Sequence, residues 1–381
     1  MTRVLFRMLR ILIALVASLL AFVAGALVLG GYVPAIPKAG VIGPVLTGQY
    51  PLHVALIGLT GLLLGLLALR LGLRRWGRVL TVVTSVATAG AVVVAGVQAK
   101  AAYQAGTDVQ WAEMFTQIAY PGVRPDVTET FAGDLQADVY LPRGASARTP
   151  AIVLAHAGGF HTFDRADLRG TGRWLADHGV AAVAVDYRLS APGAPTWDRA
   201  PQDFVCALAW TRANAARFNL DVDRLSVGGM SAGGGLALNA AYRLQAGEAT
   251  SSCGDVPPPP ASVVGFYPVT DVSEMWTRNI DGSRNAAVLY TGGSPSEFPA
   301  RYREVSPKTF VRPGLMPTLL VVGDRDRSAR PEDVTAFARL LTDHGVPVTT
   351  KILPFAEHSP DDAYGSLPAQ HSRQILLDFL S

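Results

Sequence analysis

The stretch Asp-Arg-Leu-Ser-Val-Gly-Gly-Met-Ser-Ala-Gly-Gly, residues 223–234, decides the fold of this chain. Its first half is a strand-like run that ends at Gly228, and a helix-length segment begins at Ala232. Between them stands Gly229-Met-Ser-Ala-Gly233, in which a serine occupies a sharp turn from strand to helix. The two glycines remove the side chains that such a turn would crowd. The pattern therefore predicts an activated Ser231 hydroxyl at the edge of a sheet.

Strand-like runs and helix-length segments alternate on both sides of this motif, which predicts an α/β fold with a mostly parallel sheet flanked by helices. Five or six consecutive apolar residues are typical of a strand buried on both faces. An earlier alternating run, Asp134–Leu141, is expected to form an antiparallel edge strand. The segment Asp271–Gly314 has no clear strand and is expected to form a lid or pocket wall. The predicted strands are 151–155, 180–185, 225–228, 262–266, 318–322 and 350–354, and the predicted helices are 203–218, 232–246, 331–344 and 368–380.

The first hundred residues differ in kind from the rest of the chain. Residues 1–107 contain no Asp or Glu and nine basic residues, whereas the remainder has 24 Lys and Arg against 30 Asp and Glu. Three uncharged runs lie here, over residues 11–33, 52–69 and 79–99. Since about 20 apolar residues allow a helix to cross a bilayer, we expect three transmembrane helices. A cleaved signal peptide is the alternative for the first run, because small residues follow its basic start.

The Lys and Arg residues also predict how these helices are oriented. Three Arg precede the first run and four lie in the 70–78 loop, against one Lys in the 34–51 loop and one after the third run. Because basic loops stay in the cytoplasm, we expect a multi-pass protein of the cell membrane whose N-terminus is cytoplasmic and whose residues beyond 100 are extracytoplasmic. Cys206 and Cys253 would then lie in an oxidising compartment and could form a disulfide; two unrelated buried thiols are the alternative.

A second motif, His156-Ala-Gly-Gly159, directly follows a buried-strand run. Adjacent glycines let the backbone approach a substrate closely, so the N–H groups of Gly158 and Gly159 are expected to face it. The N–H of Ala232, at the start of the helix after the serine, is the third expected donor. Together these groups would form an oxyanion hole for a tetrahedral intermediate. The imidazole of His156 is expected to support the loop and not to take part in catalysis.

A catalytic serine needs a general base, and histidine is the usual one. His358 lies in the loop directly after the last predicted strand. Ligands meet parallel sheets at the loops that follow the carboxyl ends of the strands. We therefore expect His358 to be the base. His161, just after the glycine loop, and His371, in the last helix, are the alternatives.

The base in turn needs an orienting carboxylate. Asp324 and Asp326 both follow the predicted strand at 318–322. Asp326 lies further into the loop and could reach across to the histidine, whereas Asp324 could fix the turn. We expect Asp326 to be the acid, and the alternative is a solvated charge cluster with the neighbouring arginines. The resulting order Ser, Asp, His is that of the α/β-hydrolase fold.

Several motifs occur in order over about residues 130–381. They are HAGGF (156–160), DYRLS (186–190), DFVCALAWTRANAARF (203–218), DRLSVGGMSAGG (223–234), GDRD (323–326) and EHS (357–359). Through these motifs the chain resembles the hormone-sensitive-lipase-like branch of the α/β-hydrolases, which comprises carboxylesterases of the bacterial kind. The family's oxyanion motif has three glycines after the histidine, and here the first of them is Ala157.

The resemblance implies hydrolysis of carboxylic esters through an acyl-enzyme, with an ester or a lipid-derived molecule as substrate. An acyltransferase or peptidase would use the same three residues, and a non-catalytic membrane interaction protein is a further alternative. No metal or organic cofactor is expected, because His, Cys and carboxylates show no metal-ligand spacing. Nucleic acid is not expected either, since the basic residues flank apolar runs. The sequence leaves any protein partner open.

These observations predict three parts of the chain. Residues 1–100 would form the transmembrane module, and residues 101–130 a connecting helix or linker. Residues 131–381 would form an α/β-hydrolase domain with a lid insertion over about 271–314.

Overall fold

The computed structural model describes residues 2–144 and 147–381. By their contacts the residues fall into two compact units. One comprises Met1–Ala119 together with Leu353–His371, and the other comprises Tyr120–Ile352 together with Ser372–Ser381. We refer to them as the helical unit and the sheet unit.

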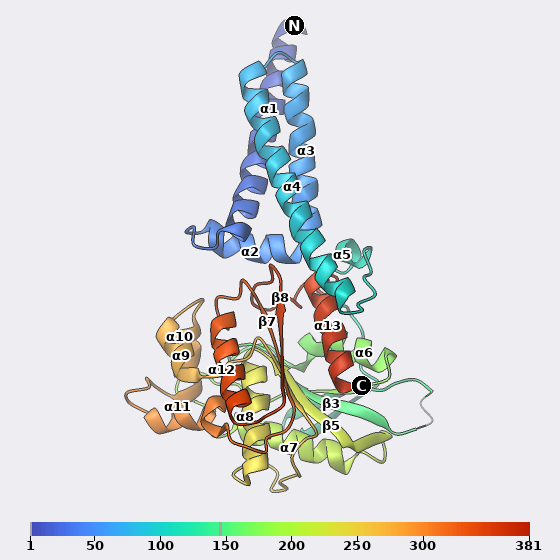
Figure 1. The fold of residues 1–381 in the computed structure, drawn as a ribbon, viewed down its shortest axis with the longest axis vertical. Coiled ribbons are helices and arrows are strands. Elements are labelled where there is room, and N and C mark those ends of the chain that lie inside the picture. The colour runs from blue at the N-terminus through green and yellow to red at the C-terminus, as the bar shows by residue number, and fades with distance from the viewer. Residues whose placement is uncertain (1, 145–146) are drawn as a thin grey trace. The chain divides into compact units, whose positions relative to one another are not determined.

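Long apolar helices make up most of the helical unit. In the part of the chain that the structure describes, three helices are long and apolar enough to cross a membrane, and their mean hydropathy is 2.8, 2.3 and 2.0 in chain order. Figure 1 shows α3 and α4 running side by side. The helices of this unit are α1 (Thr2–Tyr32), α2 (Ala39–Gln49), α3 (Pro51–Arg70), α4 (Arg74–Gln104) and α5 (Glu113–Thr116).

Small residues allow α3 and α4 to approach closely. A Cβ on Gly58 would lie 2.5 Å from the hydroxyl of Thr88, and one on Gly61 would lie 2.8 Å from the methyl group of Thr84. A Cβ on Gly65 would lie 3.1 Å from the backbone of α4. Glycine stripes of this kind are typical of helix pairs that pack in membranes, where burial of apolar surface does not drive association.

One prediction for this unit needs correction. The segment 34–51 was expected to be a loop, but most of it forms α2. Pro44 lies inside this helix, although a proline usually indicates the end of a helix or a kink in it. The helix forms because its glycines seat it against α1: a Cβ on Gly43 would lie 2.7 Å from the backbone of Gly30.

The sheet unit is built on a twisted sheet whose described strands follow the order β1-β2-β4-β3-β5-β6-β7-β8. Neighbouring strands from β4 through β3, β5 and β6 to β7 are parallel, as predicted. The strands are β1 (Val127–Ala132), β2 (Leu135–Tyr140), β3 (Thr149–Ala155), β4 (Ala181–Val185), β5 (Leu220–Met230), β6 (Val263–Phe266), β7 (Thr318–Gly323) and β8 (Val348–Leu353).

The edge of the sheet differs from the prediction. The predicted edge strand is β2, which is antiparallel to β4 as expected, but β1 pairs with its other side and forms the edge. β1 begins at Val127, inside the range expected to be a linker. Its alternate residues are exposed, and an amphipathic strand next to a turn at Gly133 lacks the continuous apolar run by which the inner strands were recognised.

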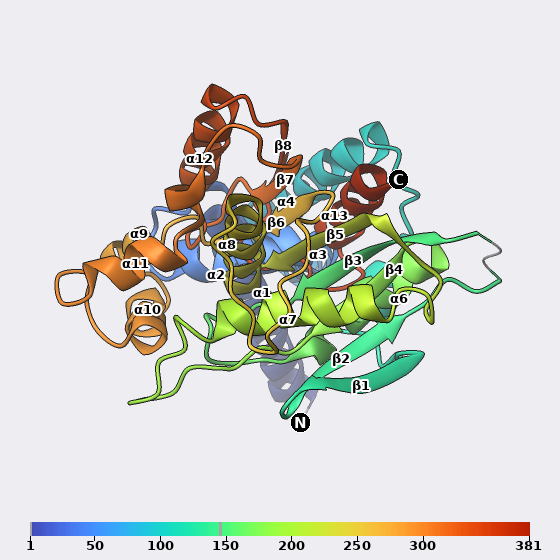
Figure 2. The ribbon, with the colours of Figure 1, turned by 90° about the horizontal axis from the view of Figure 1, so that it is seen from below.

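Helices cover both faces of this sheet. Figure 2 shows α7 (Ala200–Ala213) and α8 (Ala232–Ala246) on one face, with α6 (Arg169–Asp177) on the other. The C-terminal end of α13 (Leu367–Leu380) lies beside α6, where Arg373 covers the ring of Trp174. The sequence did not predict α6, because the helix is short and its two glycines have a weak helix propensity. The remaining helix along the sheet is α12 (Pro331–Asp343).

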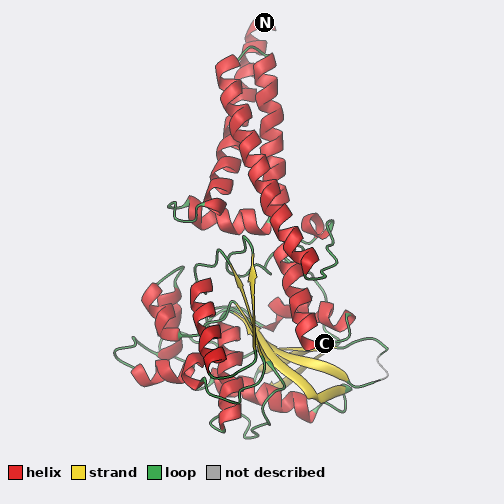
Figure 3. Ribbon diagram, in the orientation of Figure 1, coloured by secondary structure: helices red, strands yellow, loops and turns green. Residues whose placement is uncertain are grey.

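The expected insertion between β6 and β7 is helical. Figure 3 shows helices and loops here, and no described residue between these two strands belongs to a strand. The insertion contains α9 (Val272–Arg278), α10 (Ser283–Thr291), α11 (Pro299–Val305) and a short 3-10 turn (Pro307–Phe310).

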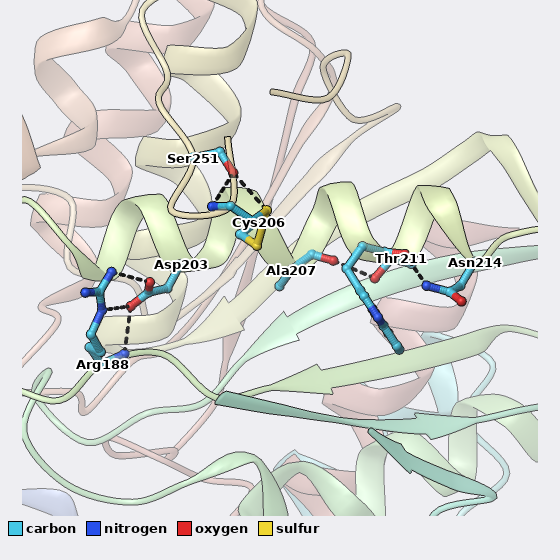
Figure 4. Close-up of a disulfide and its surroundings, with 9 residues drawn as sticks. Arg188, Asp203, Cys206, Ala207, Thr211, Asn214 and Ser251 are labelled. Carbon is cyan, nitrogen blue, oxygen red and sulfur yellow. Dashed lines mark hydrogen bonds and ion pairs between the residues drawn. A yellow bond between two sulfur atoms is a disulfide. The ribbon is translucent and has the colours of Figure 1, made fainter. Parts of the chain in front are cut away.

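A disulfide joins Cys206 of α7 to Cys253 in the loop after α8 (Figure 4). The two Cα atoms are 5.5 Å apart, and Cys206 is fully buried. One turn earlier on α7, the buried carboxylate of Asp203 binds the guanidinium of Arg188, with Nε to Oδ2 at 2.8 Å. These two links tie α7 to the loop that precedes it and to the loop after α8.

Candidate active site

Ser231 stands at the bend between β5 and α8 in a conformation that few residues adopt. Its φ is 52° and its ψ is −114°, a left-handed geometry that costs a non-glycine residue energy. Neighbouring backbone groups hold it there. The N–H of Ser231 donates to the carbonyl of Phe266 at 2.9 Å, and its carbonyl accepts from the N–H of Gly235 at 3.0 Å. A strained serine at a strand-to-helix turn is the expected form of a nucleophile elbow.

The positions of Gly229 and Gly233, on either side of Ser231, have no room for a side chain. A Cβ on Gly229 would lie 2.4 Å from the carbonyl oxygen of Gly233. A Cβ on Gly233 would lie 2.3 Å from the carbonyl oxygens of both Ala155 and His156. The sequence prediction that these positions exclude side chains agrees with this geometry. The same close approach brings the end of β3 against the start of α8.

The glycine loop after β3 has the backbone conformation of a site that faces a ligand. Gly158 has a φ of 110° and Gly159 a φ of 58°, so both are in the region that favours glycine. The carbonyl of Gly158 accepts from the N–H groups of His161 and Thr162, which closes a tight turn. Within the described residues, the N–H groups of Gly158 and Gly159 donate to no backbone carbonyl. The turn can therefore offer two donors to an oxyanion.

The side chain of His156 is hydrogen-bonded to the backbone of this loop. Its Nδ1–H donates to the carbonyl of Ala157 at 2.7 Å, and burial holds the pKa of the imidazole below its ordinary value. The neutral ring stacks on Tyr187 with the centroids 4.3 Å apart. The hydroxyl of Tyr187 donates to the carbonyl of His156 at 3.0 Å. The imidazole of His156 is therefore engaged with the backbone of this loop.

The helical insertion also contacts the glycine loop. The ring of Phe160 stacks on that of Tyr290 in α10, with the centroids 3.8 Å apart and the planes 5° from parallel. A Cβ on Gly159 would lie 3.2 Å from the methyl group of Ala286, one turn earlier on α10. The insertion thus packs directly beside the backbone donors, where a pocket wall would stand.

Asp326 has the more ordered of the two candidate carboxylates. It is buried after β7, and its Oδ1 accepts from the N–H groups of Ser328 and Ala329, each at 2.8 Å. Asp324 is half-buried, and its Oδ1 lies 3.7 Å from Nε of Arg325. Two backbone donors on one oxygen fix the orientation of the Asp326 carboxylate, as an acid that orients a base requires.

His358 follows β8, the strand next to β7 in the sheet. Its loop belongs to the helical unit, whereas Ser231 and Asp326 belong to the sheet unit. The N–H of His358 donates to the carboxylate of Glu357. Of the alternative bases, His161 is exposed with Nδ1 3.0 Å from the carbonyl of Gly159, and His371 is buried within α13.

Across residues 2–144 and 147–381, no group of three or more His, Cys, Asp and Glu side chains is arranged to hold a metal ion. The sheet unit supplies a strained serine, backbone N–H groups in the glycine loop and an ordered carboxylate at Asp326. Such a set can stabilise a developing oxyanion and carry out acyl transfer.

Sequence reasoning missed the support that Tyr187 provides. The motif Asp-Tyr-Arg-Leu-Ser at 186–190 was recognised only as part of a resemblance. An aromatic residue two positions after a buried strand, at the same sheet edge as the glycine loop, was the signal available. Its partner could not be identified from the sequence, because 31 residues separate Tyr187 from His156.

Comparison with known proteins supports the resemblance that the motifs indicated. A family model described as BD-FAE matches residues 137–341, more than half of the chain. The carboxylesterase NlhH of Mycobacterium tuberculosis is 29% identical over 247 residues, which cover 59% of this chain and 70% of NlhH. The non-reducing polyketide synthase ascC of Acremonium egyptiacum is 27% identical over 282 residues, and the chain spans only 13% of that protein.

A solved structure confirms the fold. Esterase Est2 of Thermogutta terrifontis, bound to propionate, superposes with a TM-score of 0.56 at 24% identity. The match covers 68% of this chain and 94% of Est2. The predicted α/β-hydrolase architecture, preceded by three long apolar helices, is therefore correct.

Proposed function

We propose, since this chain belongs to the BD-FAE family and has the α/β-hydrolase fold, that it is a membrane-anchored serine carboxylesterase. The substrate would be an ester of a small or lipid-derived carboxylic acid. Ser231 is the proposed nucleophile, His358 the base and Asp326 the acid. The similarity to NlhH, which is named a carboxylesterase, supports this choice of reaction.

The proposed reaction has two halves. His358 takes the proton of the Ser231 hydroxyl as its oxygen attacks the acyl carbon, and the resulting imidazolium is stabilised by Asp326. The proton then passes to the departing alkoxide, which leaves as an alcohol, and the acyl group remains on the serine. In the second half, water gives a proton to His358 as its oxygen attacks the acyl carbon. The bond between the acyl carbon and Oγ of Ser231 then breaks, Oγ takes the proton back from His358, and the carboxylic acid is released.

The oxyanion of each tetrahedral intermediate would accept from the N–H groups of Gly158, Gly159 and Ala232. The N–H of Ala232 belongs to the first turn of α8, where backbone donors lack partners within the helix. A donor aimed at a developing oxyanion contributes about 3–4 kcal/mol to the stabilisation of a transition state. Replacement of the family's first glycine by Ala157 leaves both loop donors in place.

The single observation that carries the proposal is the positive φ of Ser231 between two glycines that exclude a Cβ. A strained serine of this kind persists only where surrounding structure over-determines it, and such strain is concentrated at functional sites. The test is hydrolysis of p-nitrophenyl esters of graded chain length, together with labelling by a fluorophosphonate. Ser231→Ala should lose both activities, and the exposed Ser252→Ala should keep both. Labelling with no hydrolysis of any ester would show a reactive serine without esterase activity, and retained activity in Ser231→Ala would refute the proposal.

We further propose that the three apolar helices anchor the protein in the cell membrane, with the N-terminus cytoplasmic and the sheet unit outside. Their length and composition, and the basic residues at the end of α3 and the start of α4, support this orientation. The Cys206–Cys253 disulfide also supports it, because disulfides persist in oxidising compartments. A periplasm-active reporter fused after Ser381 should give signal. Signal from a cytoplasm-only reporter at the same site would reverse the proposed topology.

A further inference from the structure

The loop that contains His358 is held on both sides of the histidine by side chains of the helical unit. We propose, on the basis of the catalytic role assigned above to His358, that Gln49 and Gln98 are positioning residues for this base. The apolar helices would then be part of the catalytic apparatus as well as an anchor.

Gln98 holds the segment that leads into the loop. It lies on α4, is only 2% exposed, and is a buried amide on a largely apolar helix. Its Nε2 donates to the carbonyl of Pro354 at 3.3 Å and to the carbonyl of Gly48 at 2.9 Å. One amide thus joins α4, the end of α2 and the start of the histidine loop. Burial of a polar side chain in an apolar helix costs free energy unless the side chain is hydrogen-bonded, and such residues often mark functional sites.

Gln49 holds the segment that leaves the histidine. It is the last residue of α2 and is 7% exposed. Its Nε2 donates to the carbonyl of Ser359, the residue directly after His358, at 3.0 Å. This bond is one peptide unit from the proposed base, so its loss would act on the position of the imidazole.

The loop also contacts α2 through its backbone and α1 through the ring of Phe355. A Cβ on Gly48 would lie 2.2 Å from the carbonyl oxygen of Phe355. The ring of Phe355 meets the ring of Tyr32 edge to face, with the centroids 5.2 Å apart. Phe355 and Ser359 both have a φ of 53°, a conformation that non-glycine residues keep only when neighbouring groups impose it. The helical unit supplies those groups.

The far end of the loop is tied to the same unit. The N–H of Gly365 donates to the carbonyl of Gln117 at 2.8 Å. The N–H of Gln110 donates to the side-chain carbonyl of Gln370 at 2.7 Å. The segment from Pro354 to Gln370, which includes the first turn of α13, is therefore fixed at its start, beside the histidine and at its end.

These contacts explain why a base would depend on an anchor. A misplacement of about 1 Å can cost about a hundredfold in rate, because proton transfer requires near-ideal geometry. A loop with two residues in left-handed conformations would relax if the amides that bind its carbonyls were removed. The imidazole would then be displaced without any change to the groups that bind substrate.

The experiment uses the full chain in lipid nanodiscs. Gln49→Met and Gln98→Met remove the donors while keeping side-chain length, and Gly48→Ala pushes against the carbonyl of Phe355. The matched control is Gln104→Met, which alters an exposed glutamine near the end of α4. We measure kcat and KM with p-nitrophenyl acetate, per serine titrated by fluorophosphonate, and the pH dependence of kcat/KM. The end point of the titration counts the molecules with a reactive serine, so a smaller amount of folded protein is not mistaken for a lower kcat.

We expect kcat per titrated serine to fall about tenfold or more in Gln49→Met and Gly48→Ala, with KM nearly unchanged and the acid limb of the pH profile displaced. Gln104→Met should match the wild type. If Gln98→Met has no titratable serine, the positioning role is tested by Gln49→Met and Gly48→Ala alone. Wild-type kcat and pH profile in both would overturn the positioning role. Absence of titration in the wild type would instead refute the proposed function, and the two failures are therefore distinguishable.

Discussion

Tyr187 and His156 are joined twice: their rings stack with centroids 4.3 Å apart, and the Tyr187 hydroxyl donates to the His156 carbonyl at 3.0 Å. Burial raises the pKa of the Tyr187 phenol and lowers that of the His156 imidazole. Both side chains are therefore neutral near pH 7, the phenol as a donor and the imidazole with one N–H directed at Ala157. The pair orients the two carbonyls that precede the glycine loop.

Removal of the Tyr187 hydroxyl should loosen that loop. In Tyr187→Phe the stacked ring remains, but a buried carbonyl loses its donor, which costs about 1–3 kcal/mol. We expect a lower melting temperature and a lower kcat for ester hydrolysis, with KM little changed. Calorimetry and steady-state kinetics check this. Wild-type kcat in a folded Tyr187→Phe would show that the loop needs no such support.

The two candidate acids should respond differently to loss of charge. Asp326→Asn should lower kcat by about 10³–10⁴-fold, because an amide stabilises no imidazolium and favours the wrong tautomer of the base. Asp324→Asn is the matched control two residues away and should stay close to the wild type. The measurement is kcat per titrated serine for both variants. An equal loss of kcat in both variants would show that both carboxylates contribute to orienting the base. A loss of kcat only in Asp324→Asn would show that Asp324 is the acid.

A methyl group at Gly158 should damage both stability and turnover. Its Cβ would lie 2.0 Å from the carbonyl oxygen of Thr162, so Gly158→Ala adds a clash to the cost of its φ of 110°. Gly193→Ala is the control, since Gly193 also has a positive φ, 76°, but no atom lies within 4 Å of the new Cβ. We expect the free energy of unfolding of Gly158→Ala to be about 1–3 kcal/mol lower than that of Gly193→Ala. Urea denaturation measures the difference, and equal values would contradict the required close approach.

Loss of the disulfide should weaken the sheet unit without altering its chemistry. Replacing both Cys206 and Cys253 by Ala should lower the free energy of unfolding by about 2–4 kcal/mol, chiefly because the unfolded chain gains freedom. Alanine is chosen because Cys206 is fully buried and a serine hydroxyl would need a partner. Esterase activity at 20–25 °C should persist. Equal denaturation midpoints with and without a reductant would show that the bond adds no stability.

Many features of the fold could be predicted from local patterns. The helix Ala232–Ala246 begins and ends where the sequence placed it, because a glycine turn precedes it and Gly247 adopts a left-handed cap after it. The inner strands were recognised because burial on both faces leaves a nearly continuous run of apolar residues. β1 was missed because an exposed face interrupts its apolar run. α6 was missed because tertiary packing outweighs the weak helix propensity of its glycines.

The sequence by itself determined the elbow around Ser231, since a glycine-serine-glycine turn between a strand and a helix has few conformations available. It also determined the apolar helices, whose composition and length are local properties. Only the tertiary structure decided how the His358 loop is held. The donor on Gln49 is 310 residues from Ser359, and the donor on Gln98 is 256 residues from Pro354. Hydrogen bonds across such distances leave no periodic trace in a sequence, because they form only when the folded chain brings the two segments together.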